Sequence, residues 1–296
     1  MLYFGTTAMK LGVFIIDFEA EVLRKIGVET LIFPFNTQKE ILKEAEREFQ
    51  VYLEFKPFEG GIIENIFGEK IRLNALGCPS SKELREKNLQ KLKNIEYEVI
   101  MDFIRYPSPS NKEYFYTCFC KECYEKAREL GYNLNEIKMK IKRYLEKDDV
   151  NLLNEWFEFR KEVIKDYLEM SKLKYAFFFT PSLSVLVGQD YNFNLKKIHP
   201  MIYLEPIGPA CIEYELKNMR GKLKEMIMRD LEVEGEDVIK KEFEKALKSK
   251  AEIEPIVIIS ENIKERLEML KKAKKVHIFA YSKNKKNLFL KLLNAM

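Results

Sequence analysis

Four of the five cysteines are spaced in a way that suits a metal ion. Cys118, Cys120 and Cys123 form a C-x-C-x-x-C cluster in the segment YTCFCKECYEKA, directly before an expected helix. Three thiolates this close together can share one tetrahedral ion, which then requires a fourth ligand. Cys78, in LGCPSSKELREK, follows an earlier expected strand and can supply it. The pattern predicts a structural zinc bound by these four cysteines.

The cysteines can also have roles other than binding zinc. The amino terminus, MLYFGTTAMKLGVFIID, shows no cleavage site of an export signal, so a reducing cytoplasm is expected and a disulfide framework is not. An iron–sulfur cluster also takes four thiolates, and free cysteines commonly pack as small hydrophobic side chains. We prefer zinc because of the ligand set and the short spacing. Cys211, in PIGPACIEY, is expected to be a buried structural thiol.

Carboxylates at the ends of expected strands form a second group with chemical potential. Asp102 ends one apolar run and Glu205 ends another. Glycoside hydrolysis needs one carboxyl group as acid and one as nucleophile or base, ~5–5.5 Å apart for retention or ~6.5–9.5 Å for inversion. A barrel brings its strand ends to one rim, so we predict Asp102 as nucleophile or base and Glu205 as acid. Glu261, after the seventh expected strand, is the alternative second carboxylate, although it also suits the first turn of a helix.

Polar and aromatic neighbours of these strand ends are predicted to contact a substrate. Glu54 and Lys56 alternate along one face of the third expected strand, at its end. Arg105 can hold Asp102 ionised, or bind a sugar hydroxyl or a carboxylate substituent. Sugar rings can stack on tyrosines. The candidates for stacking are Tyr106, Tyr191 and Tyr203.

Each of these residues also has a purely structural interpretation. Asp102 with Arg105, and Glu54 with Lys56, can be ion pairs that tie the rim of the barrel. A desolvated Lys56 can instead form a Schiff base in an aldolase, although no phosphate-binding loop accompanies it. The only two histidines are at positions 199 and 277, and the second lies near the start of the last expected strand. A histidine triad or a multi-histidine catalytic metal site is therefore not expected.

The elements that must position these residues alternate between short apolar runs and helix-period segments. This alternation is typical of a parallel sheet covered by helices, and the chain holds no G-x-G-x-x-G turn of a doubly wound fold. Eight such units predict a (β/α)8 TIM barrel. The expected strands are Leu11 to Asp17, Thr30 to Phe35, Val51 to Lys56, Glu98 to Ile104, Tyr175 to Thr180, Pro200 to Glu205, Pro255 to Ser260 and Val276 to Tyr281. The clearest helices are expected over 37–48, 81–93, 121–130 and 261–273.

Two connections are longer than a bare βα unit requires. We expect helical insertions over about 133–172, after the fourth strand, and about 214–250, after the sixth. Trp156, Phe157 and Phe159 are expected to pack the first insertion down. Neither segment has a Pro/Gly/Ser-rich linker beside it, so residues 1–296 are predicted to form one domain.

The composition limits the classes of partner. With 46% hydrophobic and 33% charged residues the chain has the composition of a globular protein with a core, and no apolar run reaches the ~20 residues of a membrane span. The net charge of +4 comes from Lys and Arg mixed closely with Glu, which argues against a nucleic-acid surface. Abundant Lys, Glu and Ile with few Gln resemble a thermophile's composition. The oligomeric state is left open.

The motifs resemble known carbohydrate-active barrels. The cysteine spacing is similar to the zinc site of family 42 β-galactosidases, where a lone Cys ahead of a Pro and a later C-x-C-x-x-C chelate zinc beside the active-site rim. From about the third to the sixth expected strand, YEVIMDFIRYPSP and VGQDYNFNLKKIHPMIYLE resemble the D-x-I-R-Y-P and G-Q-D-Y…P-M-x-Y motifs of glycoside-hydrolase-like barrel families. The resemblance implies a carbohydrate-active site involving Asp102, Arg105, Gln189, Asp190 and Tyr203.

The chain departs from family 42 at the catalytic positions. Those enzymes carry Asn-Glu at the end of the fourth strand as acid and a Glu on the seventh as nucleophile, whereas this chain has Met101-Asp102 at the first place. We predict a cytoplasmic glycoside hydrolase that acts on an intracellular or small glycan, because an enzyme that degrades polymers would normally be exported. The alternatives are a non-catalytic barrel that binds a carbohydrate or a protein, and a barrel lyase or aldolase.

Overall fold

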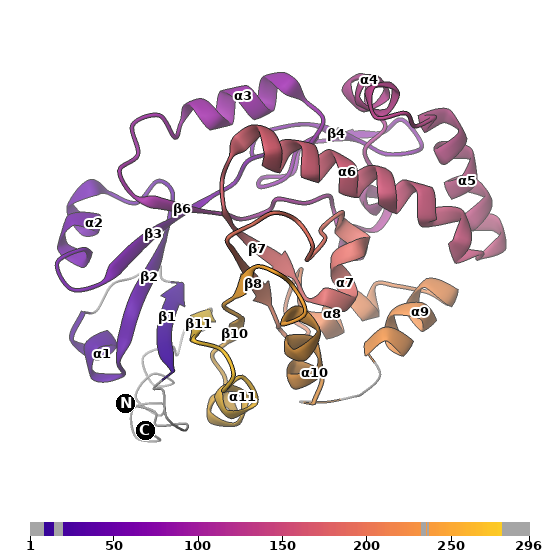
Figure 1. Cartoon of the computed structure of the whole chain (residues 1–296). Helices are drawn as coiled ribbons and strands as arrows, with labels where there is room; N and C mark the ends of the chain where they lie inside the picture. The colour runs from indigo at the N-terminus through magenta and orange to yellow at the C-terminus, as the bar shows by residue number, and fades with distance from the viewer. Residues whose placement is uncertain (1–8, 15–19, 232–234, 236, 280–296) are drawn as a thin grey trace.

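Eight parallel strands closed into a barrel form the centre of the molecule. The computed structural model describes residues 9–14, 20–231, 235 and 237–279. Figure 1 shows the strands surrounded by helices. The barrel strands are β1 (Lys10–Phe14), β2 (Val28–Pro34), β3 (Gln50–Phe55), β6 (Glu98–Met101), β7 (Tyr175–Phe179), β8 (Lys197–Met201), β9 (Glu252–Ile253) with β10 (Ile256–Ile258), and β11 (Lys275–Phe279). Pairing of β10 with β8 closes the sheet, which confirms the predicted (β/α)8 barrel.

The barrel strands form where apolar residues follow one another without alternation, because parallel strands in a barrel are covered on both faces. The run YAFFF of β7 is buried at every position. The seventh strand is split into β9 and β10 at Glu254 and Pro255, since a proline cannot donate a hydrogen bond to the sheet. All eight expected runs overlap a strand in the described part of the chain, and the ends of the first and last, 15–17 and 280–281, lie outside it.

The sixth strand is displaced from its expected position. β8 runs over Lys197–Met201 and pairs with β7 along its whole length, with Pro200 opposite Phe178. The predicted strand begins at Pro200, whereas the observed strand begins three residues earlier and includes this proline. Glu205, expected to end this strand, therefore lies four residues beyond it.

Helices of several lengths cover the barrel. The four expected helices appear as α2 (Lys39–Ala45), α3 (Lys82–Gln90), α4 (Lys121–Glu129) and α11 (Ile263–Met269). Ser81 caps α3, because its side chain accepts a hydrogen bond from the backbone N–H of Leu84. The remaining short elements are α1 (Ala20–Lys25), η1 (Pro109–Phe115), α7 (Pro181–Ser184), η3 (Val185–Val187) and the hairpin of β4 (Ile63–Glu64) and β5 (Lys70–Ile71).

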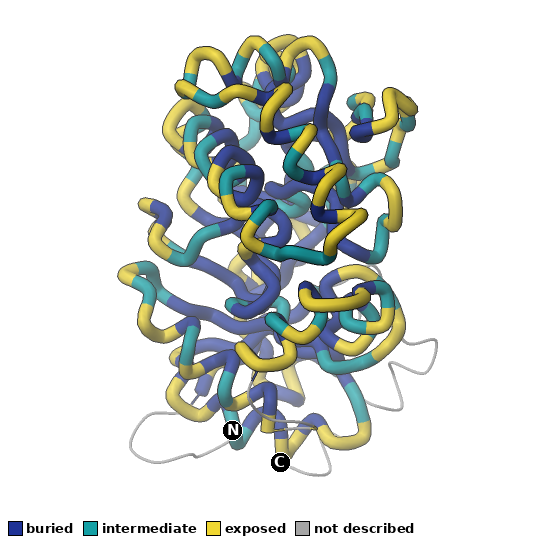
Figure 2. Tube along the Cα trace, turned by 90° about the vertical axis from the view of Figure 1, so that its right-hand side faces the viewer, coloured by how far each residue is buried: buried dark blue, intermediate teal, exposed yellow. Residues whose placement is uncertain are grey.

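The two long connections are helical. The first carries α5 (Leu134–Lys147), η2 (Val150–Leu153) and α6 (Asn154–Ser171), and the second carries α8 (Ile212–Lys217), α9 (Gly221–Leu231) and α10 (Asp237–Ala246). Trp156, Phe157 and Phe159 of α6 are all buried, as expected. Figure 2 shows buried chain running through the interior and exposed chain on the outer helices and loops. No helix in the described ranges has both the length and the apolar character that crossing a membrane requires.

Candidate functional site at the barrel mouth

The carboxyl ends of the barrel strands surround a cavity of about 390 Å³, which we call the mouth cavity. This volume lies within the ~300–1,000 Å³ range of ligand pockets. Four charged residues line it: Glu54, Lys56, Asp102 and Arg105. Aromatic side chains contribute much of its wall, among them Phe14, Phe103, Phe177, Phe179 and Tyr203. A few polar groups between aromatic walls are the arrangement that binds and orients a small polar ligand.

A sharp turn after β6 positions Asp102 and Arg105. The backbone N–H of Asp102 donates to the carbonyl of Phe55 at 2.8 Å, which continues the pairing with β3. Phe103 then adopts a left-handed conformation with φ of 52°. Its N–H donates to Oδ1 of Asp102 at 2.7 Å, and its carbonyl accepts from the N–H of Arg105 at 2.8 Å. Such a conformation costs about 1–3 kcal/mol in a non-glycine residue and is concentrated at functional sites.

Glu54 and Asp102 form a carboxyl pair in this cavity. Glu54 is only 5% exposed, and its carboxyl group lies within hydrogen-bonding reach of that of Asp102. Burial, followed by the charge of Asp102, raises the pKa of Glu54 to about 8. The Nζ atom of Lys56 lies 3.0 Å from Glu54 and opposes this shift only in part. Glu54 therefore keeps its proton near neutral pH.

The lysine of this group stays charged. Burial lowers the pKa of Lys56, but the charge and hydrogen bond of Glu54, together with Asp102, outweigh burial and raise it overall. A Schiff-base lysine needs the opposite shift, because only the neutral amine is nucleophilic. The arrangement therefore disfavours the aldolase alternative.

Some of the residues predicted to contact substrate lie elsewhere. Tyr203 lines the mouth cavity together with the four charged residues. Tyr106 is buried under the cavity against the guanidinium of Arg160. The side chain of Gln189 bonds the backbone at Ile104, Phe177 and Phe179. Asp190 accepts from Asn192 in a loop on the outside of the barrel, beside the pocket lined by Lys161. Tyr191 donates to the carbonyl of Phe179.

Glu205 also lies outside the set of residues that line the cavity. Its carboxylate pairs with Arg266 of α11, a residue that is almost fully buried. The displacement of β8 explains this position, because Glu205 follows the strand by four residues instead of ending it. The structure therefore brings Asp102 next to Glu54, and it places Glu205 in an ion pair with a covering helix.

The four cysteines of the predicted metal site come together beside the mouth. The sulfur of Cys78 lies 3.3 Å from that of Cys123 and 3.3 Å from that of Cys120, and the ligand atoms of all four, including Cys118, lie within 4.8 Å of one another. Four sulfurs bound tetrahedrally at ~2.3 Å would be about 3.8 Å apart. The cluster can therefore hold a metal ion.

Two loops meet to build this cluster. The hairpin of β4 and β5 follows β3, and the segment before α4 pairs with it: the N–H of Phe119 donates to the carbonyl of Glu64 at 2.9 Å. The N–H of Glu64 in turn points at the sulfur of Cys118, 3.5 Å away. Gly77, the residue before Cys78, lies against the backbone of Gly61. A Cβ atom on Gly77 would be 2.6 Å from the Cα atom of Gly61. Only glycine fits at this crossing.

The electrostatics of the cluster favour a cation. Burial raises the pKa of Cys123, whereas hydrogen bonds from the other thiols outweigh burial and lower the pKa of Cys118. Four thiols in contact, three of them buried, cannot all ionise unless a positive charge compensates them, and a metal ion supplies that charge. The charges of Cys123, Cys78 and Cys118 act on Tyr106, the residue next to Arg105. The cluster thus lies near Tyr106, whose neighbour in the chain, Arg105, lines the mouth cavity.

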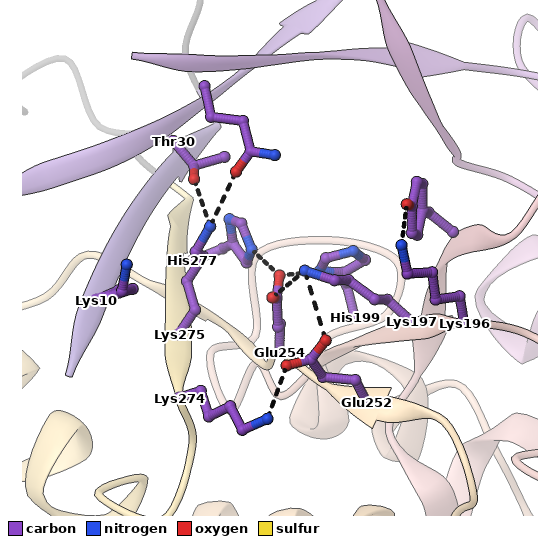
Figure 3. A network of polar contacts seen from close by, with 12 residues as sticks. Lys10, Thr30, Lys196, Lys197, His199, Glu252, Glu254, Lys274, Lys275 and His277 are labelled. Atoms are coloured by element: carbon purple, nitrogen blue, oxygen red, sulfur yellow. Dashed lines mark hydrogen bonds and ion pairs between the residues drawn. The ribbon is translucent and has the colours of Figure 1, made fainter. Parts of the chain in front are cut away.

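A second polar cluster closes the amino end of the barrel, and we call it the floor. Figure 3 shows Glu254 between His277 and Lys197. Its carboxylate lies 3.0 Å from Nε2 of His277 and 2.5 Å from Nζ of Lys197. His199 lies beside it, and neither of its ring nitrogens has a hydrogen-bond partner within the described residues. Lys275 stands at the same end and donates to Thr30 at 2.7 Å.

The floor has the ligand types of a metal site but not its charge. His199, Glu254 and His277 lie close enough together to hold an ion. However, Lys197 already pairs with the only carboxylate of the three, and its ammonium group would repel a metal cation. His277 follows the first residues of β11, which agrees with its expected place at the amino end of the last strand. We interpret the floor as a structural network.

Sequence reasoning missed several buried charged residues of this architecture, among them Arg160, Glu215 and Glu254. Arg160 of α6 donates to carbonyls of two connections, that after β6 and that after β7, and Glu215 accepts from Ser108, Ser110 and the N–H of Ala210. Glu254 joins β8, β9 and β11. The alternation of Glu252 and Glu254 beside a buried isoleucine was a usable signal for the floor, because it places both carboxylates on one face. The other two carry no local signal, since their partners are distant in the sequence.

The chain was also compared with known proteins. No protein-family model matches the sequence, and the curated proteins contain no match to it. The assignment of a function therefore depends on the geometry of the mouth cavity and on the motifs in the sequence.

Proposed function

We propose that the mouth cavity binds a carbohydrate and that Asp102 and Glu54 cleave it as the carboxyl pair of a glycoside hydrolase. The observation that carries the proposal is the buried Glu54 carboxyl beside Asp102, with a pKa raised to about 8 by burial and by that neighbour. A pair in which one carboxyl group keeps its proton near neutrality supplies both an acid and a nucleophile or base. The D-x-I-R-Y-P resemblance, which includes Asp102, supports the same assignment.

The short separation of the pair favours retention of configuration. An inverting enzyme seats a water between carboxyl groups ~6.5–9.5 Å apart, and groups within hydrogen-bonding reach leave no room for one. Binding of a glycoside would separate the pair toward ~5–5.5 Å. Asp102 would then attack the anomeric carbon while Glu54 protonates the leaving oxygen, and Glu54 would next take a proton from the water that releases the sugar. Tyr203 and the phenylalanine walls offer surfaces for the sugar ring.

Hydrolysis of chromogenic glycosides tests the proposal. The wild-type protein is expected to release the chromophore from at least one glycoside of a panel. Asp102→Asn and Glu54→Gln are each expected to lower kcat/KM by about 10²–10⁴-fold, the usual contribution of a general acid or base. Glu205→Gln is the matched control and should retain activity within a few-fold, because Glu205 pairs with Arg266 outside the cavity lining. Circular dichroism of each variant checks that it is folded.

Three other outcomes would change the assignment. Loss of activity in Glu205→Gln with retention in Glu54→Gln would restore Glu205 as the acid. Binding of sugars without turnover would indicate a carbohydrate-binding barrel, which is the second candidate because of the aromatic cavity walls. The absence of both binding and turnover across the panel would reject a carbohydrate function.

We further propose that the ion of the cysteine cluster is zinc and that its role is structural. Cys78, Cys118, Cys120 and Cys123 would hold it, a thiolate set that suits tetrahedral zinc. The ion would clamp the loops after β3 and β6, the two strands that carry Glu54 and Asp102. The cluster has no water or substrate position among its four sulfur ligands, so no part in bond breaking is assigned to it.

Metal analysis of the purified protein tests this assignment. We expect about one zinc per chain, and Cys120→Ser should lower both the zinc content and the melting temperature. Cys211→Ser is the control, because Cys211 is buried but lies outside the cluster. About one or more irons per chain with acid-labile sulfide would instead indicate an iron–sulfur cluster. The absence of both metals would refute the site.

A further inference from the structure

Two arginines are buried near the mouth, and they use their hydrogen-bond donors very differently. Arg160 donates from its two terminal nitrogens to the carbonyls of Leu186, Pro107 and Phe115, at 2.6, 3.1 and 3.0 Å. Three carbonyl partners explain how a fully buried guanidinium is tolerated there. Arg105 is equally inaccessible, at 3% exposed, but it has no such set of partners.

The guanidinium of Arg105 makes one hydrogen bond in the described structure, from Nη1 to the carbonyl of Tyr106 at 3.0 Å. A guanidinium has five N–H donors, so most of them are unused. No carboxylate of the described residues lies within ion-pair distance of it. The rings of Phe103 and Phe179 lie 4.9 and 4.7 Å from its central carbon and hold its plane in position. Because Arg105 lines the mouth cavity, a ligand in that cavity is the available partner for the free donors.

The charges around the cavity do not balance. Burial lowers the pKa of Arg105 to about 10, and the charges of Glu215 and Asp102 offset this only from a distance. Glu215 cannot approach, because its oxygens already accept from two serines and the N–H of Ala210. Lys56 adds a second cation to the lining. With Glu54 protonated, the cavity holds two positive charges against the single carboxylate of Asp102.

We propose that Arg105 anchors an anion-binding subsite in the mouth cavity, with Lys56 as its second cation, and that the bound sugar carries a carboxylate, as a uronic acid does. The identity of the ligand as a sugar rests on the proposed function, whereas the anionic group rests on Arg105 itself. A carboxylate matches the fork of a guanidinium and accepts two parallel hydrogen bonds from it. One negative charge on the ligand also neutralises the cavity.

Binding to the wild-type protein gives the first test. The probes are two matched pairs of monosaccharides, glucuronate with glucose and galacturonate with galactose, and isothermal titration measures their dissociation constants at pH 6.5. We expect at least one uronate to bind ten-fold or more tightly than its neutral partner, with a preference that weakens as salt is added. Equal binding of acid and neutral sugars would overturn the subsite.

Substitutions then locate the preference. Arg105→Gln should reduce the uronate preference to about two-fold or less, and Arg105→Lys should retain part of the charge effect but lose the bidentate geometry. Lys56→Met should weaken uronate binding to a smaller extent. Arg143→Gln, which removes an exposed arginine of α5, is the matched control and should leave the preference unchanged. A preference that survives in a folded Arg105→Gln protein would refute the assignment.

The outcomes separate this inference from the proposed function. Cleavage of neutral glycosides without a preference for uronates would support the glycoside hydrolase and reject the anion-binding subsite. Uronate binding that depends on Arg105, without cleavage of any glycoside, would support the subsite and reject the hydrolase. Absence of binding by all four sugars, together with no cleavage of any glycoside, would reject both.

Discussion

The two ends of the barrel each bury a glutamate beside a lysine, and the two glutamates are shifted in opposite directions. At the mouth, burial and the charge of Asp102 raise the pKa of Glu54 to about 8, although Lys56 lies 3.0 Å away. At the floor, burial also favours a higher pKa for Glu254, but a hydrogen bond to His277, the electrostatic influence of both histidines and a hydrogen bond to Lys197 reverse the direction and lower it. Burial is common to both sites, so the neighbours decide the sign.

The two ends differ in how completely their charged groups are paired. The floor pairs each oxygen of its carboxylate with a donor inside the protein. The mouth places two carboxyl groups together and leaves most donors of Arg105 unused. A protein tolerates such an unfinished arrangement where a ligand completes it, whereas the carboxylate of the floor already has both of its partners inside the protein. Three predictions test this contrast.

The largest effect on stability is expected from removing the carboxylate of Glu254 in the floor. Glu254→Gln removes the negative charge next to Lys197 and should lower the free energy of unfolding at pH 7 by up to about 3–5 kcal/mol, because a largely buried ion pair is broken and Lys197 keeps only the more distant Glu252. The pKa of Glu254 is lowered on folding, so this contribution is complete above the unfolded carboxyl value of ~4.3 and is lost as the pH falls below it. Urea unfolding at several pH values measures the difference.

Glu252→Gln is the control for this prediction. Glu252 also lies near Lys197, at 3.7 Å, but its side chain is 35% exposed. An ion pair of this kind is worth about 0–1 kcal/mol. Equal destabilisation by the two substitutions would mean that the floor is not a specific buried pair.

An effect of comparable size with the opposite dependence on pH is expected at the mouth. Folding raises the pKa of Glu54, so its contribution to stability is complete below ~4.3 and is lost as the pH rises toward 8. Between these values the wild type should lose up to about 1.4 kcal/mol per pH unit relative to Glu54→Gln, which cannot ionise. Urea unfolding of both proteins from pH 5 to 9 measures this slope. A flat difference, or one that slopes as for Glu254→Gln, would contradict the raised pKa.

The parts of this architecture that the sequence predicts are those encoded locally. The eight strands are short apolar runs, and the C-x-C-x-x-C cluster is a fixed spacing, so each is visible in one segment of the chain. Asp102 and Arg105 were found for the same reason, because they follow directly after such a run. The joining of Cys78 to the cluster required only that neighbouring loops of a barrel meet at one rim.

The parts that sequence reasoning did not reach depend on register and on distant partners. The expected strand start at Pro200 moved the end of the sixth strand to Glu205, and the hypothesis of its pairing with Asp102 followed from that boundary. Nothing near Glu54 in the sequence indicates that Asp102 raises its pKa, since the contact forms only when β3 and β6 pair. Arg160 likewise joins two connections, after β6 and after β7, that the fold alone brings together.

The smallest effect is expected from removing the lysine of the mouth. Lys56 is partly exposed, so Lys56→Met should change the free energy of unfolding at pH 7 by about 1 kcal/mol or less. The positive charge of Lys56 is what holds the pKa of Glu54 down against burial and Asp102, and its removal should move the pKa of Glu54 above 8. The free energies of unfolding of Lys56→Met and of the double variant Lys56→Met, Glu54→Gln are compared over a range of pH. The pH at the midpoint of the change in their difference reports the pKa of Glu54 in the Lys56→Met protein. Lys91→Met, which breaks the exposed pair with Glu59, should leave the midpoint unchanged. A midpoint that stays in place or falls in Lys56→Met would show that the lysine does not act on the carboxyl pair, and the mouth would then differ from the floor in more than the charges of its neighbours.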